Sequence, residues 1–377
     1  MKVALVHDHL NQIGGAERVV QACHIIWPDA PLYTLVHDPK VIKGFFGDLD
    51  IKTSFIQKFP FALPYLRWYL SLMPAAIESF NFSGYDVVLS SASSFGKGAI
   101  APPNSIHICY CHTPTRYLWS DTNTYASDVG GAVIGKILPI ILNRLRMWDQ
   151  LAAQRVDYFI ANSHFVAERI KRYYNRESTV IYPPVDVTKY PHAKKKDYFV
   201  LVSRLRPYKK VEIAIKAFNR LNMKLVIVGD GEERKSLQKI AGNKILFTGN
   251  LSEEKKKRTL SKALGFIHPQ EEDFGISAVE AMAAGTPVIA YDAGGARESI
   301  IQDVTGMFFE EQTWQSLADT VIRFNKFSAK GRPLHFGGQA AFGWDYNHIR
   351  NHAQQFSRER FMGEIKSFVE TKYFERS

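Results

Sequence analysis

Short apolar runs alternate with helical patterns along the whole sequence, and this alternation constrains the fold more than any other feature. One series opens at Val3–Val6 and a second opens at Tyr198–Ser203. Alternating strand and helix signals predict βαβ units with parallel sheets, so two series predict two such domains of the α/β class. Further strands are expected at residues 32–35, 87–90, 107–110, 158–161, 224–228, 245–248, 265–268 and 288–291.

The stretch between Pro183 and Lys196 is rich in proline, lysine and polar residues, which is typical of a junction between domains. Three segments are therefore expected, at 1–187, 188–350 and 351–377. The last has helical periodicity and follows a loop at 330–344 rich in glycine. For that loop, a specificity insert and a plain surface loop both remain open.

Bulk composition describes a globular protein of about two domains without a disulfide framework. The chain has 377 residues, of which 46% are hydrophobic and 23% charged. Only three cysteines occur, which indicates a reducing compartment. The apolar run Val3–Val6 at the start of the sequence is too short for a signal peptide. No segment reaches the ~18 apolar residues that a membrane span needs. We therefore expect a cytoplasmic protein. Its net charge of +11 would attract nucleic acid, an anionic membrane surface or phosphorylated ligands.

The stretch Glu271–Gly285 predicts a loop followed by a short helix that could hold a phosphate. Gly275 lets a ligand approach the backbone, and Ser277 can cap the helix. A helix N-terminus attracts anions because its amide groups are unpaired and carry partial positive charge. Glu272 on the loop and Glu280 in the first turn would flank that site and accept hydrogen bonds from hydroxyl groups. The combination suits a sugar nucleotide, although two glutamates alone are more often part of an ordinary helix.

Gly14 and Gly15 lie between the first strand and the first helix, where glycine lets a ligand touch the backbone. No acidic residue follows at the spacing of a dinucleotide-binding fingerprint. A plain pair of loop glycines is an equally good explanation.

Cys109, Cys111 and His112 together invite a zinc interpretation, which we reject because no second pair of ligands follows at zinc spacing. Cysteines at alternate strand positions are usually just buried. His112, however, ends a strand and precedes a Thr-Pro turn, which is where open α/β sheets place ligand-contacting residues.

Two cations open the second half of the chain, because Arg204 follows its first strand and Lys209 starts the next helix. Fixed cations beside a helix N-terminus suit a diphosphate, and the alternative is a pair of solvated charges. The charged run at 253–258 is expected to be a solvated helix face.

Two stretches, 51–82 and 136–155, combine aromatic, aliphatic and basic residues in a way that suits a membrane interface. An amphipathic helix packed on its own domain is at least as common an explanation.

Together these motifs resemble those of the retaining glycosyltransferases of family 4, which have the GT-B fold. The matching residues are Glu272 and Glu280 for the E-x7-E signature, Arg204 and Lys209 for the strand-Arg-x4-Lys motif, and Gly14 and Gly15 for the N-terminal glycine loop. The segment from His112 to Trp119 is similar to the His-Thr-Pro-x-Arg-Tyr-x-Trp segment of bacterial mannosyltransferase-like members. The resemblance covers nearly the whole chain. It implies two Rossmann-like domains facing across a cleft, acceptor-binding first and donor-binding second, with a C-terminal helix crossing back to the first.

The resemblance also implies transfer of a sugar from a nucleoside diphosphate to a hydroxyl group with retained anomeric configuration. The groups that would stabilise the leaving diphosphate, without a metal or other cofactor, are Arg204, Lys209 and the amides of Gly275, Ile276 and Ser277. Glu280 would hold the ribose hydroxyls and His112 would contact the donor sugar. Glu272 would hold sugar hydroxyls beside the anomeric carbon, acting either as a nucleophile or as an orienting carboxylate.

Family analogy favours GDP-mannose as the donor, with UDP-sugars as the alternative. The expected acceptor is a lipid-linked saccharide of a surface polysaccharide, which would place the protein peripherally on the inner face of the membrane. Nucleic acid is not an expected partner. The rivals from other classes are a basic nucleic-acid- or membrane-binding protein without transferase activity, a GT-B epimerase and a sugar-nucleotide sensor.

Overall fold

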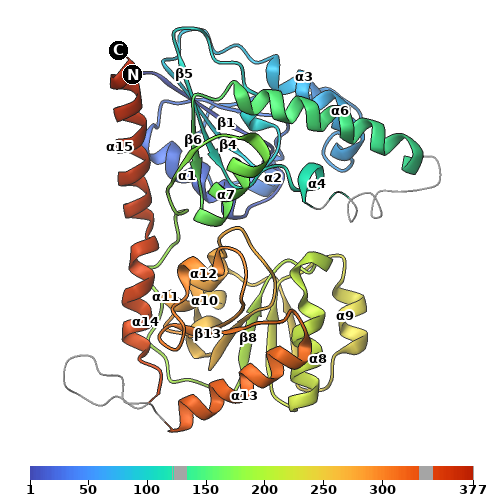
Figure 1. Cartoon of the computed structure of the whole chain (residues 1–377), viewed down its shortest axis with the longest axis vertical. Helices are drawn as coiled ribbons and strands as arrows, with labels where there is room; N and C mark the ends of the chain where they lie inside the picture. Colours follow the sequence, from blue (N-terminus) through green and yellow to red (C-terminus); the bar gives the residue numbers. More distant parts are fainter. Residues whose placement is uncertain (121, 123–133, 331–342, 377) are drawn as a thin grey trace. The chain divides into compact units, whose positions relative to one another are not determined.

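A computed structural model describes residues 1–120, 122, 134–330 and 343–376. The chain divides into two compact units, Met1–Pro184 with Glu359–Ser377 and Val185–Arg358 (Figure 1). The sequence placed the corresponding junctions after residues 187 and 350. Most of the loop expected at 330–344 lies outside the described residues.

The first unit contains a parallel sheet of seven strands in the order β3-β2-β1-β4-β5-β6-β7. The strands are β1 (Val3–His7), β2 (Leu32–Thr34), β3 (Ile51–Thr53), β4 (Val87–Ala92), β5 (Ile106–Cys111), β6 (Tyr158–Ala161) and β7 (Ser178–Val180). β3 and β7 were not anticipated from the sequence. Each is only three residues long at an edge of the sheet, and neither contains a fully buried residue.

The helices of the first unit include one from the far end of the chain. They are α1 (Gly15–Ile26), α2 (Pro39–Ile42), α3 (Met73–Glu78), α4 (Arg116–Trp119), α6 (Ile134–Gln154), α7 (His164–Tyr174) and α15 (Arg358–Arg376), with 3₁₀ segments η1 (Phe55–Lys58), η2 (Leu66–Leu72) and η3 (Gly96–Gly98). Ser163 caps α7, because its hydroxyl accepts a hydrogen bond from the amide of Val166 at 3.0 Å. No helix in the described part of the chain is long and apolar enough to cross a membrane.

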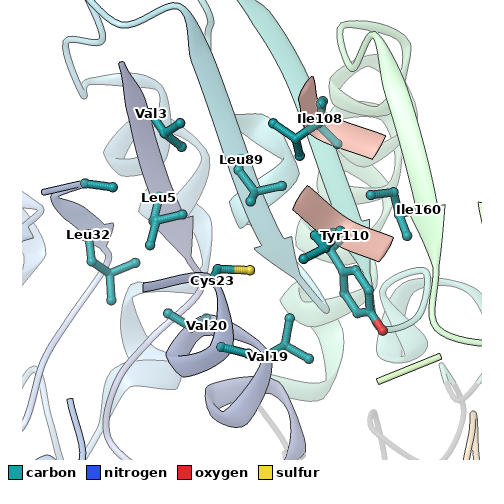
Figure 2. Packing of buried hydrophobic residues seen from close by; sticks show 14 of the residues in the cluster. Val3, Leu5, Val19, Val20, Cys23, Leu32, Leu89, Ile108, Tyr110 and Ile160 are labelled. Atoms are coloured by element: carbon teal, nitrogen blue, oxygen red, sulfur yellow. The ribbon is translucent and has the colours of Figure 1, made fainter. Parts of the chain in front are cut away.

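One core of the first unit lies between its sheet and α1 (Figure 2). Val19, Val20 and Cys23 on α1 pack against strand residues such as Leu5 and Leu89. The C-terminal helix α15 joins the same core through three fully buried side chains, Phe361, Ile365 and Val369. The expected return of the C-terminal helix to the first domain is therefore confirmed.

The second unit contains a parallel sheet of six strands in the order β10-β9-β8-β11-β12-β13. The strands are β8 (Phe199–Val202), β9 (Leu225–Val228), β10 (Ile245–Gly249), β11 (Gly265–His268), β12 (Val288–Tyr291) and β13 (Gly306–Phe309). The helices are α8 (Val211–Leu221), α9 (Arg234–Ile240), α10 (Glu253–Lys262), α11 (Ile276–Ala283), α12 (Ala296–Ser299), α13 (Trp314–Lys330) and α14 (Tyr346–Ala353), with 3₁₀ segments η4 (Pro207–Lys209) and η5 (Gln354–Phe356). This strand order is that of a Rossmann-type sheet, so the α/β prediction is confirmed.

Candidate active site

The strand order of the second sheet reverses between β8 and β11, which lie side by side. In open α/β sheets, ligands bind at the carboxyl ends of the two strands that flank such a reversal. Lys209 lies on the connection that leaves β8, and Glu272 lies on the loop that leaves β11. The topology therefore brings two residues 63 positions apart to the same point.

Lys209 and Glu272 form an ion pair there, in which the ammonium group donates to Oε1 of the carboxylate. The side-chain amide of Gln270 donates to the same oxygen at 2.9 Å. Burial would raise the pKa of Glu272, but the charge of Lys209, aided by His268, lowers this pKa to about 2. The carboxylate is therefore ionised at neutral pH, as either proposed role for Glu272 requires.

The helix α11 begins directly after this loop, with Gly275 as its N-cap in the left-handed conformation (φ +88°). A Cβ atom on Gly275 would lie 3.3 Å from Nε2 of His268, so glycine suits the backbone and the space. Ile276 and Ser277 are the first two helical residues, whose amides have no acceptor within the helix. The expectation that Ser277 caps the helix is wrong, because Ser277 lies inside the first turn and the cap makes no side-chain hydrogen bond.

Glu280 lies in the second turn of α11, not in the first turn as expected from the sequence. Its two carboxylate oxygens accept from Nζ of Lys256 on α10, at 3.1 and 3.2 Å. Both side chains are largely buried. The expectation of a solvated face at 253–258 is therefore wrong for Lys256, because this residue turns inward to neutralise the buried Glu280.

Arg204 and Lys209 both follow β8, as expected, but in different environments. Arg204 lies two residues beyond the strand and its side chain is exposed. Lys209 ends the 3₁₀ segment η4, and Lys210 separates it from α8. The expectation that Lys209 starts the helix is therefore wrong, because α8 begins at Val211.

Two features of this site escaped the sequence interpretation. His268 ends β11 and is fully buried, yet its Nε2 makes no hydrogen bond within the described residues and lies 4.0 Å from Oε2 of Glu272. The strand-end rule that singled out His112 applies equally to His268. The turn after β12 also supports the loop, since the amide of Gly295 donates to the carbonyl of Glu272 at 2.8 Å. A Cβ on Gly294 would lie only 2.4 Å from that carbonyl oxygen, so the contact needs glycine.

In the first unit, His112 directly follows β5, and its Nε2 lies 2.8 Å from the hydroxyl of Ser91 on β4. Asn162 donates to the carbonyl of His112 at 2.9 Å, so the backbone of His112 is held as well. Burial and the charge of His7 lower the pKa of His112 to about 4. His112 is therefore neutral at pH 7 and can donate or accept one hydrogen bond at Nδ1.

A buried charge network lies at the end of β1 in the same unit. His7 lies 3.6 Å from Oε1 of Glu17 on α1 and 2.9 Å from the carbonyl oxygen of Ser91. Burial would lower the pKa of His7, but Glu17 raises it, and His7 in turn helps to hold the pKa of Glu17 at about 2. Neither His7 nor Glu17 was predicted from the sequence as a site residue, although a histidine at a strand end was the available signal.

The strand order of the first sheet reverses between β1 and β4, and Asp8 connects the loops that follow these two strands. Its carboxylate accepts hydrogen bonds from the amides of Ser93, Ser94 and Gly96 at 2.6–3.0 Å. Gly14 is the N-cap of α1 and Gly15 is its first residue, so both lie on the loop that follows β1. Cys109 and Cys111 are buried, as expected. In the described part of the chain, no group of three or more potential His, Cys, Asp or Glu ligands is placed to hold a metal.

The predicted site residues thus fall into two groups. Six of them lie in the second unit, around the ends of β8 and β11 and the start of α11. They are Arg204, Lys209, Glu272, Gly275, Ile276 and Ser277. Glu280 lies deeper in α11, bound to Lys256. Gly14, Gly15 and His112 belong to the first unit.

Comparison with known families covers most of the chain. The sequence model described as Glycosyltransferase Family 4 matches residues 13–189, and the model described as Glycosyl transferases group 1 matches residues 185–330. The chain belongs to glycosyltransferase family 4. It is a glycosyltransferase, and the resemblance stated from the sequence is confirmed.

Several relatives of this family 4 glycosyltransferase are mannosyltransferases. It is 24% identical over 375 residues to the alpha-1,3/1,6-mannosyltransferase ALG2 of Dictyostelium discoideum, a match that covers 81% of this chain and 85% of that protein. A GDP-mannose-dependent alpha-mannosyltransferase of Mycolicibacterium smegmatis is 40% identical over 110 residues, or 29% of each chain. The second match therefore spans less than a third of that relative's length.

The fold is GT-B, as expected. Anabaena HepE, whose crystal structure was solved in complex with UDP, matches with a TM-score of 0.72 and 19% identity. The match covers 98% of this chain and all of that one. At this level of identity the likeness concerns the fold alone.

Proposed function

We propose that this glycosyltransferase moves mannose from GDP-mannose to a hydroxyl group of a lipid-linked saccharide, with retention of the anomeric configuration. The observation that carries the proposal is the ion pair of Lys209 and Glu272 at the reversal of the second sheet. The loop of Glu272 leads into the first turn of α11, whose amides have no acceptor within the helix. A cation, a carboxylate and exposed amides at one point suit a diphosphate joined to a sugar.

An arriving diphosphate would compete with Glu272 for the ammonium group of Lys209. The released carboxylate could then accept hydrogen bonds from sugar hydroxyls, while Arg204, Lys209 and the amides at 275–277 stabilise the charge of the leaving diphosphate. These fixed charges would do so without a metal, and we expect activity to persist in EDTA. We expect Glu280, which binds Lys256, to hold the ribose hydroxyls, and neutral His112 to contact the donor sugar.

The choice of donor is supported by relatives named as GDP-mannose-dependent enzymes. The lipid-linked acceptor is supported by relatives whose names specify a dolichol-linked saccharide or an O-antigen chain. Such an acceptor would keep the protein peripherally on the inner face of a membrane.

Donor identity is tested by thermal shift with GDP-mannose, GDP, UDP-glucose and UDP. We expect a rise in Tm with the two guanosine ligands only. A rise confined to the uridine ligands would replace GDP-mannose by a UDP-sugar. A gel shift with nucleic acid at physiological salt, without any response to nucleotide sugars, would favour the nucleic-acid-binding alternative.

The role of Glu272 is tested by Glu272→Gln, with Glu271→Gln as the control because Glu271 is the exposed neighbouring carboxylate. Slower transfer with unchanged retention would support an orienting carboxylate, whereas a trapped glycosyl-enzyme or an altered stereochemical course would support a nucleophile. Full activity of Glu272→Gln would contradict the proposed site.

A further inference from the structure

Two buried polar side chains, His268 and Gln270, lie beside the carboxylate of Glu272. His268 is the last residue of β11, and Gln270 lies two residues further along the loop that leaves this strand. Neither residue is more than 2% exposed, so bulk water does not serve as their hydrogen-bond partner. Buried polar groups are almost always hydrogen-bonded, and a donor left over at this point therefore indicates a missing partner.

The ionised carboxylate of Glu272 fixes the orientation of the Gln270 side chain. A carboxylate without a proton only accepts hydrogen bonds, so the atom of Gln270 that lies 2.9 Å from Oε1 of Glu272 must be the amide nitrogen. The opposite orientation would place the amide oxygen against a negatively charged oxygen. The same nitrogen lies 3.2 Å from Nδ1 of His268 and can only donate, so Nδ1 accepts this hydrogen bond.

The tautomer of His268 follows from this contact. Burial lowers the pKa of His268 from its ordinary value of 6.5, although the charge of Glu272 acts in the opposite direction, so the ring is neutral at pH 7. A neutral ring carries one N–H, which must be at Nε2 because Nδ1 accepts. This buried N–H has no acceptor within the described residues. Oε2 of Glu272 lies 4.0 Å from Nε2, about 1 Å too far for a hydrogen bond.

The ion pair with Lys209 cannot hold Glu272 unchanged if Lys209 also binds a diphosphate. Burial would raise the pKa of Glu272, and the charge of Lys209 is the main influence that holds it at about 2. A bound diphosphate would offset that charge while the carboxylate stays buried, so the carboxylate would need another donor to remain ionised. A rotation that moves Oε2 of Glu272 toward His268 supplies this donor, and Oε1 can keep its contact with Gln270.

We propose that His268 is a positioning residue, which becomes the partner of Glu272 when the sugar nucleotide engages Lys209. The N–H at Nε2 of His268 would donate to Oε2 of Glu272, while Gln270 continues to donate to Oε1. A carboxylate has about four lone-pair sites, so two remain for hydroxyl groups of the donor sugar. The carboxylate would thus stay ionised and keep one orientation while the diphosphate leaves. This inference rests on the proposed function, because it requires a ligand that binds Lys209.

A crystal structure of the wild type with GDP tests the proposal without any substitution. We expect Nζ of Lys209 to contact the diphosphate and Oε2 of Glu272 to lie about 2.7–3.2 Å from Nε2 of His268. The proposal is overturned if bound GDP leaves Glu272 paired with Lys209, or if a phosphate oxygen contacts Nε2 directly.

Kinetics separate a positioning role of His268 from a purely structural one. Phenylalanine fills the space of the imidazole but has no donor, whereas a glutamine side chain can place an N–H near the position of Nε2. For release of GDP from GDP-mannose, His268→Phe should lower kcat about tenfold or more and change KM by less than about twofold, and His268→Gln should restore most of the rate. His352→Phe is the control and should keep its kcat, because His352 bonds to the carbonyl of Ser299 and not to Glu272.

A double-mutant cycle shows whether His268 acts through Glu272. Adding His268→Phe to Glu272→Gln should cost little further activity, because the carboxylate that His268 positions is already gone. Additive losses would refute the positioning role. A wild type whose Tm responds to neither GDP nor UDP would refute the proposed function and this inference with it, whereas a Tm response combined with a normal kcat in His268→Phe would refute this inference alone.

Discussion

Ser91 connects two histidines of the first unit through different atoms. Its hydroxyl lies 2.8 Å from Nε2 of His112, and its carbonyl oxygen lies 2.9 Å from Nδ1 of His7. A neutral imidazole has one N–H, so the direction of the hydrogen bond at Nε2 decides whether Nδ1 donates or accepts. Ser91 is thus a positioning residue for His112.

Replacing Ser91 with alanine is expected to lower kcat about tenfold, because His112 loses the partner that fixes its tautomer and ring orientation. The measurement is the steady-state rate as a function of pH with GDP-mannose. Ser90→Ala is the matched control, because the hydroxyl of Ser90 bonds His107 at 2.8 Å and not His112. If both variants lose the same activity, the effect is structural and the positioning role is refuted.

The buried histidines should also make the protein acid-labile. Burial and, less strongly, Arg155 lower the pKa of His107 to about 3, and the pKa of His112 is lowered to about 4. As the pH falls below 6.5, the ordinary pKa of histidine, these side chains take up protons in the unfolded state but not yet in the folded state. The free energy of unfolding should therefore fall by up to about 1.4 kcal/mol per pH unit for each histidine, until the pH reaches the pKa of the folded state. His7 has a raised pKa, so its contribution is present below pH 6.5 and is lost as pH rises.

Urea unfolding of His107→Gln between about pH 6.5 and pH 4 checks this expectation. The slope of stability against pH should decrease by about one proton relative to the wild type. His192→Gln, which changes an exposed histidine, should leave the slope unchanged. An unchanged slope in His107→Gln would show that His107 does not stay neutral in the folded protein.

At the scale of one element, the C-terminus of α11 is held by several hydrogen bonds. The amide of Gly285 donates to the carbonyl of Met282 at 2.8 Å, and that of Thr286 donates to Ala281 at 2.9 Å, which is a Schellman motif. Gly285 has a φ of +68°, and Arg350 donates to the last carbonyls of the helix, Ala284 at 2.8 Å among them. The helix that presents the first-turn amides is thus fixed at its C-terminus.

Two Gly→Ala substitutions should therefore have opposite signs. Gly285→Ala should destabilise the protein by about 1–3 kcal/mol, because alanine disfavours this backbone conformation and its Cβ would lie 2.6 Å from Nε of Arg350. Gly363→Ala, on the exposed face of α15 where a Cβ meets nothing within 4 Å, should stabilise it by about 0.5–1 kcal/mol. Thermal unfolding of both variants is the measurement, and a stable Gly285→Ala would contradict the cap.

At the scale of the whole molecule, the first unit is built from both ends of the chain. Residues 185–358 separate the main part of the first unit from α15 in the sequence. Nevertheless, Phe361, Ile365 and Val369 of α15 are fully buried in the core of the first unit. The first unit cannot complete this core until the second unit has been synthesised. Its stability should therefore depend on the last nineteen residues, 359–377.

Ile365→Ala should destabilise the first unit by about 2–5 kcal/mol, because it leaves a cavity among fully buried side chains. Hydrogen exchange resolved along the chain should show faster exchange in β1, β4 and β5 and little change in β8 and β11. Phe374→Ala on the same helix is the control, since Phe374 is 70% exposed and should have little effect. Equal loss of protection in both units would mean that they unfold as one.

The sequence by itself determined the fold class, most strands and the residue types of the site. Buried parallel strands are continuous apolar runs, so the first and last residues of β6, β11 and β12 could be predicted correctly from the sequence. The family motifs selected Lys209, Glu272 and Glu280 as candidate site residues. The short edge strands β3 and β7 carry too little apolar signal to be recognised, and β13 was also missed.

Only the tertiary structure decided which charges face one another. The pairing of Lys209 with Glu272 follows from the adjacency of β8 and β11, which is set by packing. Lys256 belongs to a run of charges that looks solvated in the sequence, and it pairs with Glu280 because α10 places it beside α11. A one-dimensional pattern records which side chains are apolar or charged, but the partner of a charge depends on contacts between distant segments.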